Sequence, residues 1–295
     1  MADIQVFDRN QVRRQRDRAA ATLAGHGFLF EEVADRLLDR LVDVTRRFPL
    51  ALDLGGRAGM LGRKLLDQGR INRLVSCDLS PRLAALAPRP AVVGDEEALP
   101  FAPASFDLIA SNLSLHWVND LPGALVQINH ALKPDGLFLA AMFGGETLRE
   151  LRHCLLEAEA SEEGGASPRV SPFADVRDAG SLLQRAGFAL PVVDIDSITV
   201  TYAEPLRLLA DLRGMGETNA TLARRKGFLR RGTLMRALEL YRARHGGQDG
   251  RVPATFQVLT LTAWRPHASQ QKPLARGSGK ANLAEFLDKF GPPRS

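Results

Sequence analysis

The stretch LALDLGGRAGMLG, from Leu50 to Gly62, is an apolar run that ends in an acid and continues into a glycine-rich turn. A helix-like run from Met60 to Gln68 follows, so the pattern predicts a strand, a tight turn and a helix, the first unit of a nucleotide-binding α/β domain. Gly55 and Gly59 have no Cβ, which lets the backbone approach a ligand, and the N-terminus of the next helix favours polar or anionic groups. We therefore expect a ligand to lie across this turn.

A single turn of this kind also joins strands to helices that bind nothing, so the acids that follow later strands matter more. Leu74 to Cys77 reads as a second strand and is followed by Asp78, where a ribose diol can be held by two hydrogen bonds. A third run, AVV, precedes Asp95 and Glu96. Because open α/β sheets bind ligands at the carboxyl ends of their strands, we expect these acids and Asp53 to converge at one edge.

The composition limits the kind of protein that this chain can form. Its 295 residues are 45% hydrophobic, which is enough to bury the core of one large domain. A formal net charge of +5 among 25% charged residues is a modest excess and argues against nucleic acid as a partner. Two cysteines suit neither a disulfide framework nor a zinc site, so we expect a reducing compartment, the cytoplasm. We expect neither a secretory signal nor a membrane span, because no apolar run is long enough.

The order of strand and helix patterns predicts the fold. Their alternation from Leu50 to Phe143 predicts parallel strands joined by right-handed crossovers. Two later alternating runs, Val192 to Tyr202 and Phe256 to Trp264, predict an antiparallel end to the sheet. The expected fold is α/β and Rossmann-like, with a seven-stranded, mostly parallel sheet and helices on both faces. The chain divides into an N-terminal helical extension (1–48), the α/β core (49–203), a helical lid insertion (204–250), the final strand of the core (251–267) and a flexible C-terminal tail (268–295).

Four local elements are expected outside the parallel strands. A helix from Asp8 to about Arg18 carries five arginines, which the simplest interpretation places on a solvated face. A second helix, from Phe30 to Phe48, has apolar residues at helical spacing and should end at Pro49. The glycine- and proline-bearing run from Ser161 to Phe173 predicts a flexible surface segment near the ligand edge. A short helix is expected near Leu283 to Phe290 in the tail.

The acid, the glycine turn and the later acids resemble the class I S-adenosylmethionine-dependent methyltransferases, over roughly Leu50 to Phe143. The resemblance implies S-adenosylmethionine as cofactor, with Asp53, Gly55 and Gly59 at its methionine end, Asp78 on the ribose, and Asp95 with Glu96 near the adenine. The turn departs from the family pattern at its middle glycine, which is Arg57 here. If Arg57 projects away from the ligand, cofactor binding survives; if it enters the pocket, binding weakens or is lost.

Seven separated motifs make the chain resemble one subgroup more closely. This subgroup consists of complex I assembly factors that hydroxylate an arginine on a NADH dehydrogenase subunit, and it is similar to the malonyl-carrier-protein methyltransferases of biotin synthesis. The resemblance implies a complex I subunit as protein partner, with peripheral contact to a membrane complex. The motifs are FDRNQVRR (Phe7–Arg14), SLHWVNDL (Ser114–Leu121), MFGGET (Met142–Thr147), Ser171–Phe173, LRGMGETN (Leu212–Asn219), VPATFQ (Val252–Gln257) and Arg276–Ser278.

Candidate reactive residues follow the fourth predicted strand. Asn112, His116 and Trp117 would lie beside the reacting group, with His116 as a base and Trp117 stacking on a cation. The alternative is that Trp117 belongs to the core and His116 bonds a turn. Glu146 and Glu217, in motifs of the subgroup, are candidates to bind a substrate guanidinium, or else serve as a helix cap or surface charge. The six histidines are scattered, so no metal site is predicted.

Three functions remain open on these residues. By resemblance, the chain modifies an arginine of a complex I subunit. Alternatively, it methylates a small molecule or an acyl-carrier-protein thioester, and an acidic carrier would be steered by arginines. As a third possibility, it is a non-catalytic assembly chaperone that uses the same fold. The arginines that would steer a carrier are Arg13, Arg14, Arg224, Arg225, Arg230 and Arg231.

Overall fold

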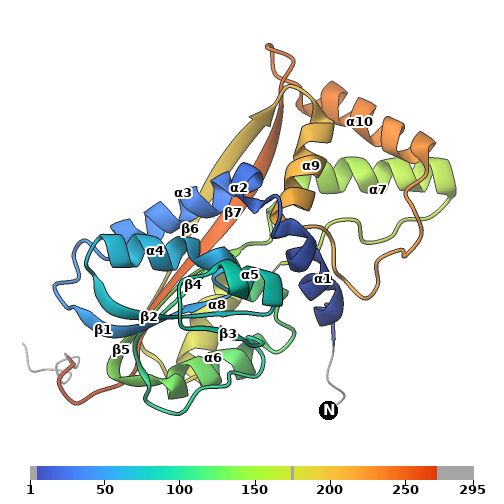
Figure 1. The fold of residues 1–295 in the computed structure, drawn as a ribbon. Helices are drawn as coiled ribbons and strands as arrows, with labels where there is room; N and C mark the ends of the chain where they lie inside the picture. The colour runs from blue at the N-terminus through green and yellow to red at the C-terminus, as the bar shows by residue number, and fades with distance from the viewer. Residues whose placement is uncertain (1–4, 174–175, 271–295) are drawn as a thin grey trace, which may run out of the picture.

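A seven-stranded sheet forms the centre of the computed structural model, which describes residues 5–173 and 176–270. The strand order is β3-β2-β1-β4-β5-β7-β6 (Figure 1). The first five of these strands are parallel, whereas β7 runs antiparallel to both β5 and β6. The expected α/β fold and its antiparallel end are therefore confirmed. The strands are β1 (Phe48–Leu54), β2 (Ile71–Asp78), β3 (Ala91–Val93), β4 (Phe106–Asn112), β5 (Leu132–Phe143), β6 (Ala189–Tyr202) and β7 (Val252–Trp264).

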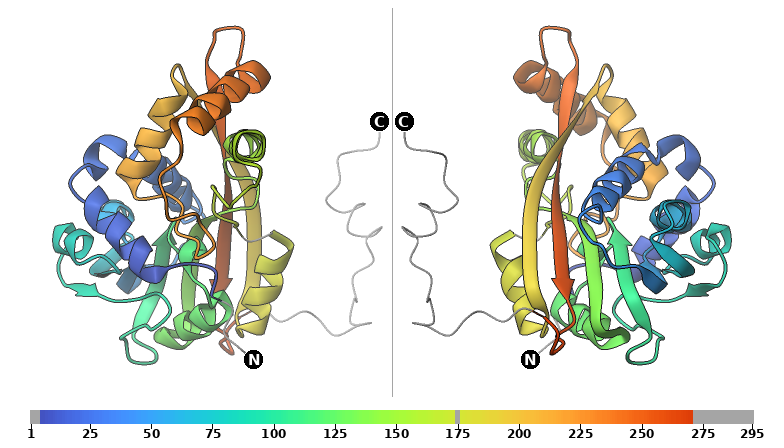
Figure 2. Two further views of the ribbon diagram at one scale, coloured as in Figure 1. Left: turned by 90° about the vertical axis from the view of Figure 1, so that its right-hand side faces the viewer. Right: turned by 90° about the vertical axis from the view of Figure 1, so that its left-hand side faces the viewer.

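Helices cover both faces of the sheet (Figure 2). One face packs against α3 (Phe28–Asp39) and α4 (Met60–Asp67), the other against α6 (Leu121–Ala131) and α8 (Val176–Arg185). Every residue of β4 is buried, as expected for a parallel strand covered on both faces. Among the helices of the described ranges, none is long and apolar enough to cross a membrane. The other elements of this part of the molecule are α1 (Arg9–Ala19), α2 (Leu23–His26), α5 (Pro81–Leu86) and two 3₁₀ turns, η1 (Arg57–Gly59) and η2 (Leu115–Trp117).

The antiparallel strands β6 and β7 carry a second group of helices at one end of the molecule (Figure 1). This group comprises α7 (Arg149–Glu163), α9 (Pro205–Met215) and α10 (Arg231–His245). Helix α10 packs against α7 and α9, and it also contacts β7. Because α9 and α10 fall between β6 and β7 in the chain, the predicted helices between the last two strands are present. The domain boundaries and the role of these helices as a lid stay predictions.

The predicted helix from Phe30 to Phe48 is wrong over its second half. Helix α3 ends at Asp39, and Phe48 and Pro49 are the first residues of β1. Phe48 pairs with Ile71 of β2 and is fully buried, so the residue that continued the helical spacing fills the strand core instead. Proline is tolerated at this position because the first residues of a strand can lack a ladder donor. Pro49 is therefore the second residue of the strand and does not end a helix.

The segment from Ser161 to Phe173 is held to the protein more firmly than predicted. Its first residues belong to α7, which ends at Glu163. Arg169 forms an ion pair with the buried Glu159, and Ser171 is buried. Two other predictions, the short helix at 283–290 and the motif at 276–278, lie outside the described residues.

Candidate active site

The carboxyl ends of three parallel strands bring the predicted acids to one edge of the sheet. Asp53 in β1 pairs in register with Ala110 of β4, and Asp78 at the end of β2 pairs with Val93 of β3. Glu96 follows β3 and is fully buried. The convergence expected from the sequence is therefore observed.

Two arginines of α1 occupy this edge. Arg16 is fully buried, and its guanidinium donates to Glu96 Oε1 at 2.9 Å and to Ser114 Oγ at 2.7 Å. The same guanidinium lies 3.6 Å from Asp78 Oδ1. Arg9 forms ion pairs with Glu96 and Asp95. Burial alone would raise the pKa of Glu96, but Arg16 and Arg9 outweigh it and hold this pKa well below its usual range.

The prediction of a solvated arginine face on α1 is therefore wrong for Arg9 and Arg16. Arg13 and Arg14 on the same helix are exposed, as predicted. The sequence indicated which arginines of this helix would be buried. Arg9 and Arg16 are seven positions apart and share a helix face with the apolar Val12. Val12 is fully buried, which turns that face toward the protein.

Asp53 keeps one free oxygen inside the protein. Its Oδ2 accepts a hydrogen bond from the Gly62 N–H at 3.2 Å, whereas Oδ1 is buried without a hydrogen-bond partner. Burial raises the pKa of Asp53 to about 7, and the nearby Asp78 carboxylate adds to that increase. Asp53 Oδ1 is therefore available to bond a polar group of a ligand.

The glycine turn packs tightly against neighbouring side chains. A Cβ at Gly55 would lie 2.0 Å from Ser114 Oγ, and one at Gly59 would lie 2.2 Å from Pro88 Cδ. Ser114 therefore occupies the space into which a side chain at Gly55 would project. Both glycines have positive φ, and so do Arg57 and Ala58 between them, with φ of 45° and 62°.

Arg57 points into the protein and meets Glu217, which follows α9. The two side chains form a buried ion pair, each 2% exposed. The Arg57 guanidinium also donates to Met215 O at 3.1 Å and to Leu113 O at 3.2 Å. Its Cζ lies 4.7 Å from the centre of the Phe30 ring, in a cation–π arrangement. These contacts show where the Arg57 side chain points, and whether that place belongs to the cofactor pocket stays a prediction.

His116 and Trp117, both on η2, complete the surroundings of Glu217. Glu217 Oε2 lies 3.0 Å from His116 Nε2 and 2.9 Å from Trp117 Nε1. The Phe143 N–H donates to His116 Nδ1 at 3.4 Å, which assigns the imidazole proton to Nε2. Burial lowers the pKa of His116, and for Glu217 the pairing with Arg57 and His116 outweighs burial and lowers the pKa. A neutral imidazole therefore donates to an ionised carboxylate.

These bonds bear on the role predicted for His116. A general base needs a free lone pair, and the one on Nδ1 already accepts from the backbone. Trp117 is 1% exposed and packs against Phe7 with ring centres 5.4 Å apart, so it is both a core residue and a donor to Glu217. The predicted base role thus requires the Phe143 bond to open first.

The remaining two predicted residues lie apart from Glu217. Asn112 Nδ2 donates to Phe30 O at 2.8 Å and ties β4 to α3, while its Oδ1 is buried without a partner. Glu146 is 58% exposed and lies 3.6 Å from Arg149 in a surface ion pair. The structure therefore brings together His116, Trp117 and Glu217, and leaves Glu146 at the surface.

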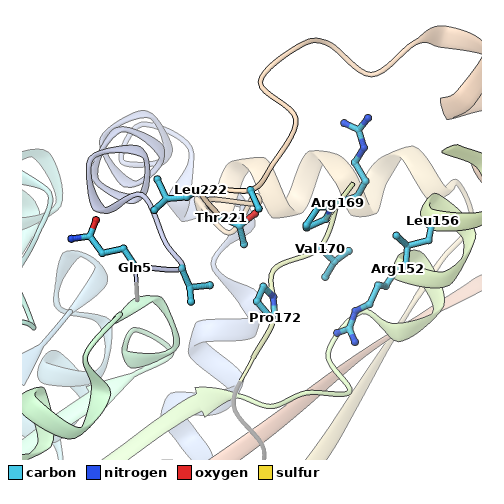
Figure 3. A pocket seen from close by; sticks show the side chains of 11 residues that line it. Gln5, Arg152, Leu156, Arg169, Val170, Pro172, Thr221 and Leu222 are labelled. Atoms are coloured by element: carbon cyan, nitrogen blue, oxygen red, sulfur yellow. The ribbon is translucent and has the colours of Figure 1, made fainter. Parts of the chain in front are cut away.

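Two neighbouring cavities lie on the side of α7 and α9. The inner cavity, of about 180 Å³, has mostly apolar walls from α7 and α9, and Glu217 lines it. The outer cavity, of about 510 Å³, lies between α7, residues 168–172 and residues 221–223 (Figure 3). Both are lined by Arg169 and Val170, so they adjoin. Nothing in the sequence patterns pointed to these cavities.

The strand-end residues fit S-adenosylmethionine in their chemistry. Asp78 lies at the tip of β2, where a carboxylate can accept both ribose hydroxyls, and Asp53 Oδ1 is a buried acceptor without a partner. The described residues include no group of three or more His, Cys, Asp or Glu side chains placed to hold a metal ion. In this structure the guanidinium of Arg16 lies beside Asp78 and Glu96. A cofactor that bonds to these carboxylates must therefore either share them with Arg16 or move its guanidinium away.

The fold and the strand-end acids define a methyltransferase domain, and residues 52–140 match the family model described as "Methyltransferase domain". A solved Haemonchus contortus phosphoethanolamine N-methyltransferase, with S-adenosylhomocysteine bound, has the same fold at a TM-score of 0.52 and 19% identity, over 87% of this chain and 60% of that one. A Danio rerio protein named "Arginine-hydroxylase NDUFAF5, mitochondrial" is 47% identical over 97% of this chain and 90% of its own length. The chain therefore belongs to the NDUFAF5 arginine-hydroxylase family. A malonyl-[acyl-carrier protein] O-methyltransferase of Halorhodospira halophila is 40% identical over 95% of both chains.

Proposed function

We propose that this chain binds S-adenosylmethionine and modifies an arginine of a NADH dehydrogenase (complex I) subunit during assembly of that complex. The likeness to an arginine-hydroxylase along nearly the whole chain supports the reaction and the partner. The observation in the site that carries the proposal is Glu217, a buried carboxylate that lines a cavity between α7 and α9 and is bonded to His116 and Trp117. A buried carboxylate of this kind binds a guanidinium by charge-assisted hydrogen bonds.

The chain's own residues form two groups, one for the cofactor and one for the substrate. Asp53, Gly55 and Gly59 hold the methionine end of the cofactor, Asp78 holds the ribose, and Asp95 with Glu96 lies near the adenine. Glu217 holds the substrate guanidinium, with His116 and Trp117 orienting the carboxylate through their N–H groups. When bound, S-adenosylmethionine supplies an electrophilic methyl group on sulfur. Positioning of the reactants is the main contribution of the protein.

Mass spectrometry of the substrate tests the proposal directly. The gene is deleted, and peptides of the complex I subunits are analysed intact. Loss of one oxygen atom from a single arginine identifies the modification as hydroxylation, whereas loss of a methyl group identifies it as methylation. Defective assembly with unchanged subunit masses would leave only a non-catalytic chaperone. The proposed compartment is the cytoplasm, and the Danio rerio relative is named as mitochondrial, so fractionation is part of the same experiment.

A second candidate is methylation of an acyl-carrier-protein thioester. The Halorhodospira halophila relative favours it. Arg13, Arg14 and Arg231 are exposed and can attract an acidic carrier. The other three arginines of the predicted carrier surface, Arg224, Arg225 and Arg230, lie in ion pairs with acids of the chain. A requirement for biotin in the deletion strain, with normal complex I, would identify this candidate.

A further inference from the structure

The guanidinium of Arg57 sits in a binding cage that satisfies both of its terminal nitrogens and leaves Nε without a partner. The cage consists of the Glu217 carboxylate, the carbonyl oxygens of Leu113 and Met215, and the face of the Phe30 ring. The planar, delocalised guanidinium suits this set, because its N–H groups spread to several acceptors while its face stacks on an aromatic ring. A lysine ammonium would satisfy only part of the same contacts.

The position of Arg57 in the chain is unfavourable for its backbone. Arg57 has a φ of 45° and Ala58 a φ of 62°, in the left-handed region that glycine adopts more readily than other residues. The turn therefore carries a side chain at a position where glycine would be less strained. The contacts of the side chain in the cage offset this strain.

The cage also borders the inner cavity. Glu217 lines that cavity, whereas Arg57 is not among the lining residues, so the cavity meets Glu217 on a side that Arg57 does not occupy. At about 180 Å³ the cavity is smaller than the roughly 300–1,000 Å³ of sites for whole small molecules, and it suits a single side chain. Its leucine walls on α7 and α9 match the methylene stem of an arginine.

We infer that this cage is the binding site for the guanidinium of the substrate arginine, and that Arg57 occupies it until the substrate side chain displaces it. The inference rests on the proposed arginine modification and assigns Phe30, Leu113 O and Met215 O to its substrate site. Exchange of one guanidinium for another leaves Glu217 paired throughout, so the buried carboxylate is not left alone. The adjoining outer cavity, beside Arg169 and Val170, then takes the peptide on either side of the arginine.

The test empties the cage and refills it with a small guanidinium. Arg57→Gly removes the side chain and suits the positive φ, so it is the variant expected to fold. The probe is ethylguanidinium, with ethylammonium as the control of equal charge. Trp117 donates to Glu217 and reports on the cage by fluorescence, in a Trp264→Phe background that removes the second of the two tryptophans.

We expect ethylguanidinium to change the Trp117 fluorescence of Arg57→Gly saturably and to raise its Tm, with ethylammonium binding roughly tenfold more weakly or not at all. The parent protein, whose cage is filled, and the double variant Arg57→Gly/Glu217→Gln should show neither effect. Equal responses to both cations, or an unchanged response in the double variant, would overturn the inference.

A second measurement keeps the test decisive if Arg57→Gly folds poorly. Arg57→Lys retains the charge but loses the planar fork, so an arginine peptide should compete for its cage at lower concentration than in the parent protein. Equal competition in both proteins would count against the cage. Because these readouts are binding signals, they are independent of catalysis: a cage that binds ethylguanidinium in a protein that modifies no arginine would refute the proposed function alone.

Discussion

Arg57 and Glu217 stand 160 positions apart in the chain and form an ion pair that is buried on both sides. Arg57 also donates its backbone N–H to Asp78 Oδ2 at 3.1 Å. One residue of the glycine turn thus connects the acid expected to hold the cofactor ribose with the acid proposed to hold the substrate. The carboxylate of Glu217 is in turn bonded to His116 and Trp117.

Substitution of Glu217 should destabilise the fold. Glu217→Gln leaves the guanidinium of Arg57 buried without its counter-charge, and removal of one partner of a buried pair costs about 3 kcal/mol or more. Urea denaturation should show this loss in the free energy of unfolding. Glu146→Gln is the matched control, because Glu146 is 58% exposed, and it should change little. A Glu217→Gln protein as stable as the parent would mean that the pair does not form in solution.

The raised pKa of Asp53 should make stability fall as pH rises. Its pKa is about 7 in the folded protein against an ordinary 3.8, so between these values the folded state holds a proton that the unfolded state has released. Stability from this residue is fully present below about pH 4 and is lost as pH rises through about 7. Over that window the loss is on the order of 4 kcal/mol.

Asp53→Asn isolates this contribution from those of other groups. The amide does not ionise, so the variant should lack the part of the pH dependence that Asp53 causes. Denaturation curves of both proteins at pH 5 and pH 7.5 measure the difference. Parallel pH profiles for the parent and the variant would show that Asp53 is ionised in the folded protein throughout.

Cofactor binding should depend on Asp78. Asp78→Ala removes the carboxylate that is expected to accept the ribose hydroxyls, and loss of charged hydrogen bonds weakens binding by about 1.5–3 kcal/mol, or roughly tenfold to a hundredfold. Calorimetry with S-adenosylmethionine measures the change. Asp107→Asn is the control, because Asp107 lies at the start of β4, at the opposite edge of the sheet. Equal affinity of the parent and Asp78→Ala would reject the ribose assignment.

Arg16 should contribute to stability in a way that depends on pH. Its guanidinium lowers the pKa of Glu96 below the ordinary 4.5, so this stabilisation is present above 4.5 and fades as pH falls through the folded pKa. Arg16→Met should cost about 3 kcal/mol near neutral pH, and progressively less below pH 4.5. Arg13→Met, an exposed arginine on the same helix, is the control. A deficit of the same size at every pH would attribute the effect to packing alone.

The sequence alone determined the architecture of the sheet and the position of its acids. Each strand-end acid is local to its own strand, and parallel pairing then places Asp53, Asp78 and Glu96 at one edge. The sequence did not give the end of the helix before β1, because an apolar residue at position 48 fits a helical spacing as well as a strand core. The pairing of Phe48 with Ile71 places it in the strand. Local patterns do not contain such long-range contacts.

Only the tertiary structure decided what the acids contact. The sequence showed that an arginine replaced a glycine in the turn, but the direction of Arg57 depended on Phe30 in α3 and on Met215 and Glu217 at the end of α9, two segments that are distant in the chain. Arg16 was predicted to be solvated, because an arginine-rich helix normally faces water, and its burial follows from the carboxylates that β2 and β3 present to it. A charged side chain is buried in a protein only where groups of opposite charge pair with it. Those counter-charges are brought together by the fold and are not adjacent in the chain.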